Sequence, residues 1–155
     1  MTKKWKLEPD TIPKATHGIN LRSHLQSYQW DRIRRHCYKK AGYKCEICGG
    51  VGQTHPVECH EEWEWDFSGG YQVLKGVTAL CPSCHEVKHI GLARVRGRFW
   101  DAMRHMASVN GKTVDDCKMR MSYLSRIAIA KSESITAVDM NIAEKLERDA
   151  CNDFI

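Results

Sequence analysis

Two short cysteine pairs constrain this 155-residue chain more than any other feature of its sequence. Each pair has the form CxxC, 32 residues separate them, and they consist of Cys45 with Cys48 and Cys81 with Cys84. Two such pairs place four thiolates at the corners of a tetrahedron, which is the coordination of a closed structural zinc site. A site of this kind contributes on the order of 10–16 kcal/mol of apparent free energy, enough to hold together a region with little apolar core. We therefore predict that these four cysteines bind one structural Zn²⁺.

The chain has eight cysteines, so a disulfide scaffold is the alternative to a metal site. Lysines occur near the start, but no apolar segment follows them as it would in a secretory signal. No apolar run reaches the length that spans a bilayer. We therefore expect a reducing, cytoplasmic location without a membrane partner, where paired cysteines bind metal. Cys37 and Cys117 fall on apolar helix faces and are predicted to pack, and Cys151 is assigned no role.

The formal charge of +5 is unevenly distributed along the chain. Residues 1–44 carry 11 basic and 3 acidic side chains, residues 45–90 carry 2 and 7, and residues 91–155 carry 11 and 9. An acidic middle between basic flanks suits a cation site held between surfaces that bind an anion. Variation along an ordinary solvated surface is the alternative interpretation.

Two groups of basic residues are candidates for binding nucleic acid. One group lies opposite the apolar face of a predicted helix and the other follows the second cysteine pair, and together they comprise Arg32, Arg35, Lys39, Arg94, Arg96 and Arg98. Basic side chains on such exposed faces contact phosphate oxygens and make binding dependent on salt. Solvation without any partner is the alternative for both groups.

Hydrophobic periodicity predicts an α+β fold in three segments. Residues 1–26 form an extended arm, residues 27–97 form a helix followed by a metal-binding hairpin and short helix, and residues 98–155 form a helical region. The element predictions are a helix over 27–41, strands over 57–65 and 71–80, a short helix from Pro82, and helices from Phe99 to Asn110, after a Thr113 cap, and from about Asp139.

Three histidines are associated with the second cysteine pair. His85 and His89 are four residues apart, so both imidazoles leave one helix face and can chelate a second metal ion. His60 lies on the predicted strand 57–65, where the period of two places it on the face opposite Cys59 and Trp65. A histidine beside a metal-bound phosphate can act as the general base that takes a proton from the attacking water.

Three segments around these residues resemble the HNH endonuclease family in its four-cysteine, ββα-metal (treble-clef) form. They are Tyr43–Gly49, Val57–Glu61 and Leu80–His89. The flanking segments Asn20–Arg22, Trp30–Arg34, His89–Gly91 and Val109–Gly111 resemble features of bacterial and phage HNH proteins. The resemblance covers most of the chain, and its specific motifs are the three segments around the cysteine pairs and His60.

The resemblance implies a nuclease that hydrolyses phosphodiester bonds in double-stranded DNA. It implies His60 as the general base, and the neighbouring Glu61 is a second candidate catalytic residue. It also implies His85 and His89 as ligands of a divalent cation (Mg²⁺, Mn²⁺, Ni²⁺ or Zn²⁺). The hairpin and the short helix would then enter the minor groove.

Two positions depart from the family pattern. Cys59 occupies the place of a metal-binding Asp or His, so Cys59, Glu61 or Glu58 is left to take that role. Gly76 occupies the place of the central Asn, and His55 is one candidate to replace its hydrogen bond. A catalytically silent module that binds nucleic acid or a protein therefore stays open as a second hypothesis, and the helical C-terminal third could pair with a copy of itself.

Overall fold

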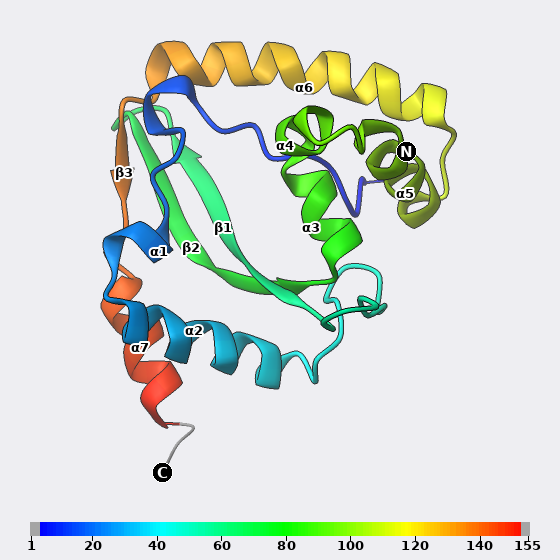
Figure 1. The fold of residues 1–155 in the computed structure, drawn as a ribbon. Helices are drawn as coiled ribbons and strands as arrows, with labels where there is room; N and C mark the ends of the chain where they lie inside the picture. Colours follow the sequence, from blue (N-terminus) through cyan, green and yellow to red (C-terminus); the bar gives the residue numbers. More distant parts are fainter. Residues whose placement is uncertain (1–3, 153–155) are drawn as a thin grey trace.

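The computed structural model describes residues 4–152 as a mixed α/β protein with a small three-stranded sheet (Figure 1). Strands β1 (Glu58–Asp66) and β2 (Tyr71–Leu80) form an antiparallel hairpin. Strand β3 (Ala137–Asp139) pairs in parallel with β2 and gives the sheet order β1-β2-β3. The predicted hairpin is confirmed. Residues 1–3 of the predicted arm and 153–155 of the predicted C-terminal region lie outside the described residues.

Seven α-helices and one 3-10 turn complete the described part of the chain. They are η1 (Lys14–Thr16), α1 (Leu21–His24), α2 (Ser27–Lys40), α3 (Pro82–Lys88), α4 (Ile90–Val95), α5 (Phe99–Asn110), α6 (Val114–Ser134) and α7 (Ala143–Asn152). Pro82 occupies the first turn of α3, where its missing N–H costs nothing. The Thr113 side chain accepts the Asp116 amide at the start of α6, and Gly111 ends α5 with φ 61°. The predictions for these helix ends are confirmed.

The last helix begins later than predicted. The pattern placed its start near Asp139, but Ala137–Asp139 pairs with β2 at Tyr71, Gln72 and Val73. Only the turn that follows leads into α7 at Ala143. The prediction was wrong because the free edge of β2 recruits this segment, and pairing with an edge overrides local propensity.

A β-bulge interrupts the pairing of the hairpin. Glu62 pairs with Gly76 and the next residue, Trp63, pairs with Leu74, so Lys75 is an extra residue in β2. Trp65, predicted on the face opposite His60, nevertheless lines the same cavity as His60 and lies under the ammonium of Lys131 in α6. The period of two therefore did not predict the surroundings of Trp65.

Three apolar clusters hold the elements around the hairpin, and the smallest of them packs Cys37 of α2 against Val57 and Ala79. The first joins the cysteine region to α3 and α5 and includes Leu80, Val87, Met103 and Met106, together with Leu7 from the arm. The second packs α2 and α7 beside the sheet. In Figure 1, α2 and α7 lie on one side of the hairpin and α6 crosses on the opposite side, while α3 starts at the base of the hairpin and α4 and α5 pack next to it.

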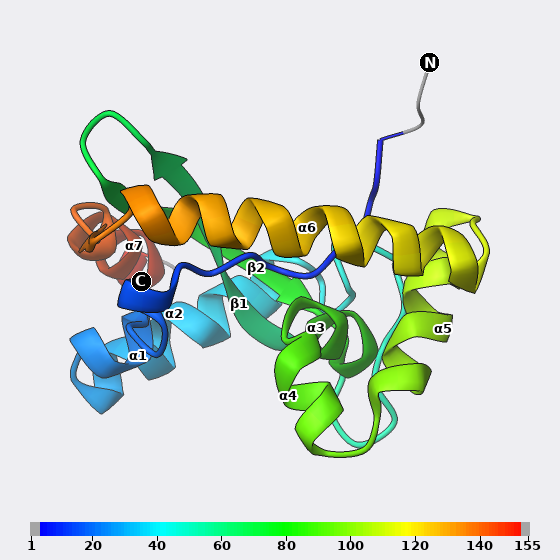
Figure 2. The same cartoon turned by 90° about the horizontal axis from the view of Figure 1, so that it is seen from above.

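The extended arm before η1 runs alongside α6 (Figure 2). Glu8 forms an ion pair with Arg120 at 2.7 Å, and the Lys14 amide donates to Ser132 Oγ at 3.0 Å. From Glu8 to Lys14 the extended arm covers about 20 Å, and from Arg120 to Ser132 helix α6 rises about 18 Å. The two segments therefore match in length and run in the same direction. The arm is thus held between α6 and the hairpin. No described helix has the length and apolarity needed to cross a membrane.

Candidate functional site

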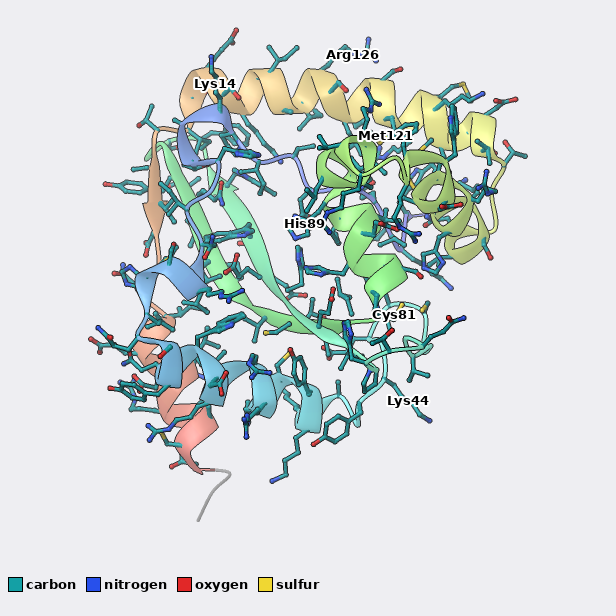
Figure 3. The ribbon with its side chains drawn as sticks, in the orientation of Figure 1. Lys14, Lys44, Cys81, His89, Met121 and Arg126 are labelled. Carbon is teal, nitrogen blue, oxygen red and sulfur yellow. The ribbon has the colours of Figure 1, made fainter. Side chains whose placement is uncertain are left out.

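The four predicted zinc cysteines come together at the base of the hairpin. Their sulfur atoms all lie within 4.8 Å of one another, and the Cys48 and Cys81 sulfurs are 3.6 Å apart. Two thiolates on one tetrahedral zinc, each with a Zn–S bond of about 2.3 Å, would be roughly 3.8 Å apart. None of these cysteines is in a disulfide. The group could therefore hold a metal ion, and Figure 3 shows its sulfurs beside Cys81.

Local hydrogen bonds bring the two cysteine pairs together. The Gly49 amide donates to the Cys45 carbonyl at 2.8 Å, and Gly49 adopts φ 75°, a conformation that glycine tolerates best. The carboxylate of Glu46 then accepts the Ala79 amide at 2.7 Å and the Thr78 hydroxyl at 2.9 Å. These bonds attach the first turn to the end of β2, which continues directly into the second pair.

The thiols are electrostatically suited to a cation. Burial opposes ionisation of Cys45, but backbone N–H donors around its sulfur lower its pKa to about 7. Burial and the neighbouring thiols raise the pKa of Cys81 to about 11, and burial also raises that of Cys84. A bound dication removes this mutual repulsion. His105 Nε2, on α5, lies 3.1 Å from the Cys84 sulfur, a contact that no sequence motif indicated.

His60, His85 and His89 form a second cluster. One ring nitrogen from each lies within 4.8 Å of the others, and the ring centroids are 4.7–5.1 Å apart. The Nε2 atoms of His85 and His89 are 3.1 Å apart, close to the roughly 3.3 Å between two imidazole ligands of one tetrahedral ion. His89 is the residue that joins α3 to α4 rather than a member of one continuous helix, and Figure 3 shows it between α3 and the hairpin.

Two carboxylates contact the rings of this cluster. Glu58 is hydrogen-bonded to His85 Nδ1, and this bond lowers the pKa of Glu58 to about 2. Asp10 Oδ2, from the arm, lies 2.8 Å from His60 Nε2. Desolvation and the charges of the other two imidazoles lower the pKa of His89 to about 4. The cluster is therefore arranged with two rings oriented by acids and a third that resists protonation.

Two residues that the sequence suggested for the catalytic site, Cys59 and Glu61, lie outside the histidine cluster. Cys59 packs with Cys37, whose thiol raises the pKa of Cys59, and it belongs to neither cluster of possible metal ligands among the described residues. Strand alternation explains this, because Cys59 and His60 point to opposite faces of β1. Glu61 accepts the Leu21 amide at 2.6 Å and so anchors the start of α1. Of the three alternatives for the missing ligand, Glu58 is the one in contact with a cluster histidine.

The position predicted for the central Asn carries no side chain. Gly76 lies opposite Glu62 in the hairpin register. His55, the predicted replacement, contacts Glu58 at 2.8 Å. The partner that His60 has instead is Asp10, which sequence reasoning missed because 50 residues separate the two. No local pattern in the arm distinguishes that aspartate.

The histidine cluster lies between two hollows. A groove of about 400 Å³ includes His85 and His89 in its lining, together with Arg96 and Arg98. A cavity of about 630 Å³ between β1, the arm and α6 includes His60, which is only 5% exposed. His85 and His89 thus face a groove lined by two arginines and two glutamates, whereas His60 is reached from the side covered by the arm.

The predicted phosphate-binding residues fall on two separate surfaces. Arg96 and Arg98 lie in the groove, where Arg98 also pairs with Glu86 at 2.6 Å, and the exposed Arg94 stacks on Phe99.

The other surface is on α2. Arg32 pairs with Glu147 of α7 at 3.9 Å and Arg35 with Asp31 at 3.4 Å, so acidic partners compensate part of its charge. Both arginines line a pocket with Cys151, and Lys39 is exposed further along α2.

Comparisons of this chain with protein-family models, with curated proteins and with solved structures found no match. The chemistry of the two clusters is therefore what bears on function.

Proposed function

We propose that this protein is a metal-dependent nuclease of the HNH type that hydrolyses phosphodiester bonds in DNA. The observation that carries the proposal is the convergence of His60, His85 and His89 beside the four-cysteine group. These histidines come from β1 and from the region of α3, which the cysteines join at the base of the hairpin. A hairpin followed by a short helix on a metal-binding base is the arrangement that the family resemblance implies.

We assign zinc to the four cysteines because four soft thiolates in a tetrahedral arrangement select it over harder cations. The spacing of the sulfurs fits that ion. This site has no open position, so its role in the proposal is to hold the hairpin against α3.

The histidine cluster supplies the chemistry. His85 and His89 would hold a divalent cation, with Glu58 fixing the orientation of the His85 ring. Such a cation stabilises the charge that develops on phosphate during hydrolysis. His60 would accept a proton from the attacking water, a role that requires its free ring nitrogen to face the cluster. Arg96, exposed in the adjoining groove, would bind a phosphate oxygen of the DNA backbone.

One observation favours the second hypothesis, a catalytically silent module that binds nucleic acid or a protein. His60 is buried under the arm, and a general base must come within hydrogen-bond reach of its water. In that case the two metal sites would stabilise the fold, and the groove that carries Arg96 would provide the binding surface.

Plasmid cleavage separates the two functions. The full chain would be incubated with supercoiled DNA in Mg²⁺, Mn²⁺, Ni²⁺ or Zn²⁺, beside His60→Ala, His85→Ala and His17→Ala. His17 is an exposed histidine outside the cluster and serves as the matched control. The nuclease requires cleavage by wild type and His17→Ala and its loss in the two cluster variants.

The binding function predicts a different pattern. Wild-type protein would cleave with none of the four cations yet retain DNA in a gel shift, and Arg96→Ala would weaken that retention. Cleavage that persists in His60→Ala would indicate a contaminating nuclease or a different base, and would refute the roles assigned here.

A further inference from the structure

We propose that Asp10 is a positioning residue for His60, and that the arm thereby supplies the orienting hydrogen bond that no hairpin side chain provides. The inference rests on the proposed function, since it gives His60 the role of general base. Asp10 lies in the extended arm, and its contact with His60 joins residues 50 apart in sequence.

The geometry of the contact is specific. Asp10 Oδ2 lies 2.8 Å from His60 Nε2, and both side chains are largely buried, with exposed fractions of 16% and 6%. An ionised carboxylate can only accept hydrogen bonds, so this contact places the ring proton on Nε2. The Nδ1 atom is then unprotonated and able to take a proton.

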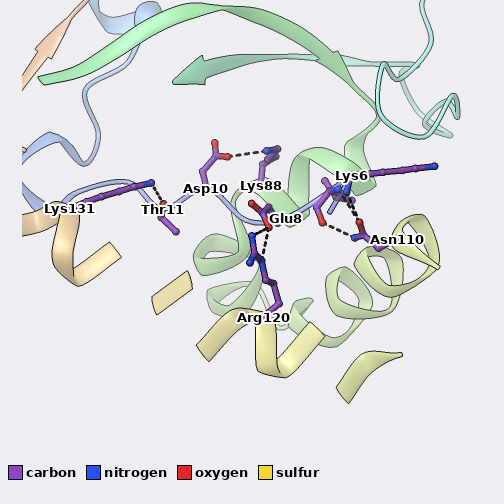
Figure 4. A network of polar contacts seen from close by, with 9 residues as sticks. Lys6, Glu8, Asp10, Thr11, Lys88, Asn110, Arg120 and Lys131 are labelled. Atoms are coloured by element: carbon purple, nitrogen blue, oxygen red, sulfur yellow. Dashed lines mark hydrogen bonds and ion pairs between the residues drawn. The ribbon is translucent and has the colours of Figure 1, made fainter. Parts of the chain in front are cut away.

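The arm holds Asp10 in this position through several further contacts (Figure 4). The other carboxylate oxygen of Asp10 accepts from Lys88 Nζ at 3.1 Å, and the Asp10 amide donates to the Lys88 carbonyl, also at 3.1 Å. Two residues before Asp10, Glu8 pairs with Arg120; this contact attaches the arm to α6 and does not involve Asp10. Asp10 itself is therefore fixed from α3, through its two bonds with Lys88.

The hairpin provides no side chain that orients the His60 ring. Gly76 has no side chain to donate or accept, and Thr78, which lies opposite His60, uses its hydroxyl to donate to Glu46. The His55 ring contacts Glu58. Asp10 is the side chain hydrogen-bonded to the distal nitrogen of His60, and the fold requires the arm to deliver it.

Kinetics with a matched arm variant test the catalytic consequence. Asp10→Asn keeps the shape of the side chain, but its amide can donate as well as accept, so it no longer enforces one tautomer. We expect kcat to fall by at least about 10–100-fold with KM unchanged, the range that applies when a carboxylate that orients a metal-binding imidazole is lost. Glu8→Gln removes the ion pair with Arg120 and should keep the wild-type kcat. An equal loss in both variants would show that arm packing alone matters and would overturn the inference.

Nitrogen NMR of the full, metal-containing chain tests the positioning without any activity. Long-range ¹H–¹⁵N spectra report which His60 nitrogen carries the proton, with signals assigned by their absence in His60→Ala. Wild type and Glu8→Gln should show the Nε2–H form, and Asp10→Asn a mixture of tautomers. An Nδ1–H form in wild type would overturn the inference. Wild-type protein that never cleaves DNA would refute the nuclease, while the spectra would still decide whether Asp10 fixes the ring.

Discussion

Replacing Asn110 with alanine should release the arm from the helices that hold it. Asn110 ends α5 and is 7% exposed. Its Oδ1 accepts the amides of Lys6 and Leu7 at 2.7 and 3.2 Å, and its Nδ2 donates to the Leu7 carbonyl at 2.7 Å (Figure 4). Asn110→Ala removes these three bonds to the arm, together with one from Nδ2 to the Met106 carbonyl within α5, and leaves the polar atoms of Leu7, a fully buried residue, without these partners.

The magnitude follows from those three bonds. A hydrogen bond within a protein contributes a net of about 1 kcal/mol, and a buried group that loses its partner costs more than an exposed one. The free energy of unfolding should therefore fall by about 3 kcal/mol. For a chain of this length that loss lowers Tm by about 6–12 °C. Because Asp10 lies on the same arm, the contact with His60 should also weaken.

Urea denaturation followed by tryptophan fluorescence measures the change. The matched control is Asn141→Ala, because the Asn141 side chain is exposed and makes no hydrogen bond to another described residue. That variant should stay within about 0.5 kcal/mol of wild type. A loss below 1 kcal/mol in Asn110→Ala, or one equal to that of the control, would refute the account of how the arm is held.

Three further predictions concern the metal sites and one buried cation. Cys84→Ser should remove one zinc per chain in metal analysis, and retention of that zinc would exclude the four-cysteine site. Glu58→Gln should weaken metal binding by the histidines about 10–100-fold in calorimetry, whereas Glu62→Gln, an exposed neighbour on β1, should leave it unchanged. Burial lowers the pKa of Lys131 from 10.5 to about 8, so its charge costs stability below pH 8 and this cost disappears as the pH rises towards 10.5. The unfolding free energy of Lys131→Met minus that of wild type should fall by about 3 kcal/mol over that interval, and a difference independent of pH would contradict it.

Local spacing was enough to predict the two clusters. Four cysteines in two CxxC pairs and two histidines one helical turn apart are close in space whenever the intervening chain forms a hairpin and a helix. The alternation of β1 likewise separates Cys59 from His60. Predictions of this type succeed because the distances are set by backbone geometry over a few residues.

The bulge in β2 and the strand Ala137–Asp139 were beyond such reasoning. The bulge at Lys75 exists only in the register that β2 adopts against β1. The segment around Asp139 became a strand because the edge of β2 was available to it. The first outcome comes from the pairing of two strands and the second from a partner that is remote in sequence.

The sequence by itself therefore determined which residues can bind metal and which elements carry them. Only the tertiary structure decided what surrounds them: Asp10 against His60, His105 against Cys84, and the arm between α6 and the hairpin. The physical reason is that ligand spacing is a local property of the backbone. The partners that orient and bury those ligands are chosen when remote segments pack, and neither Asp10 nor His105 carries a local signal of that choice.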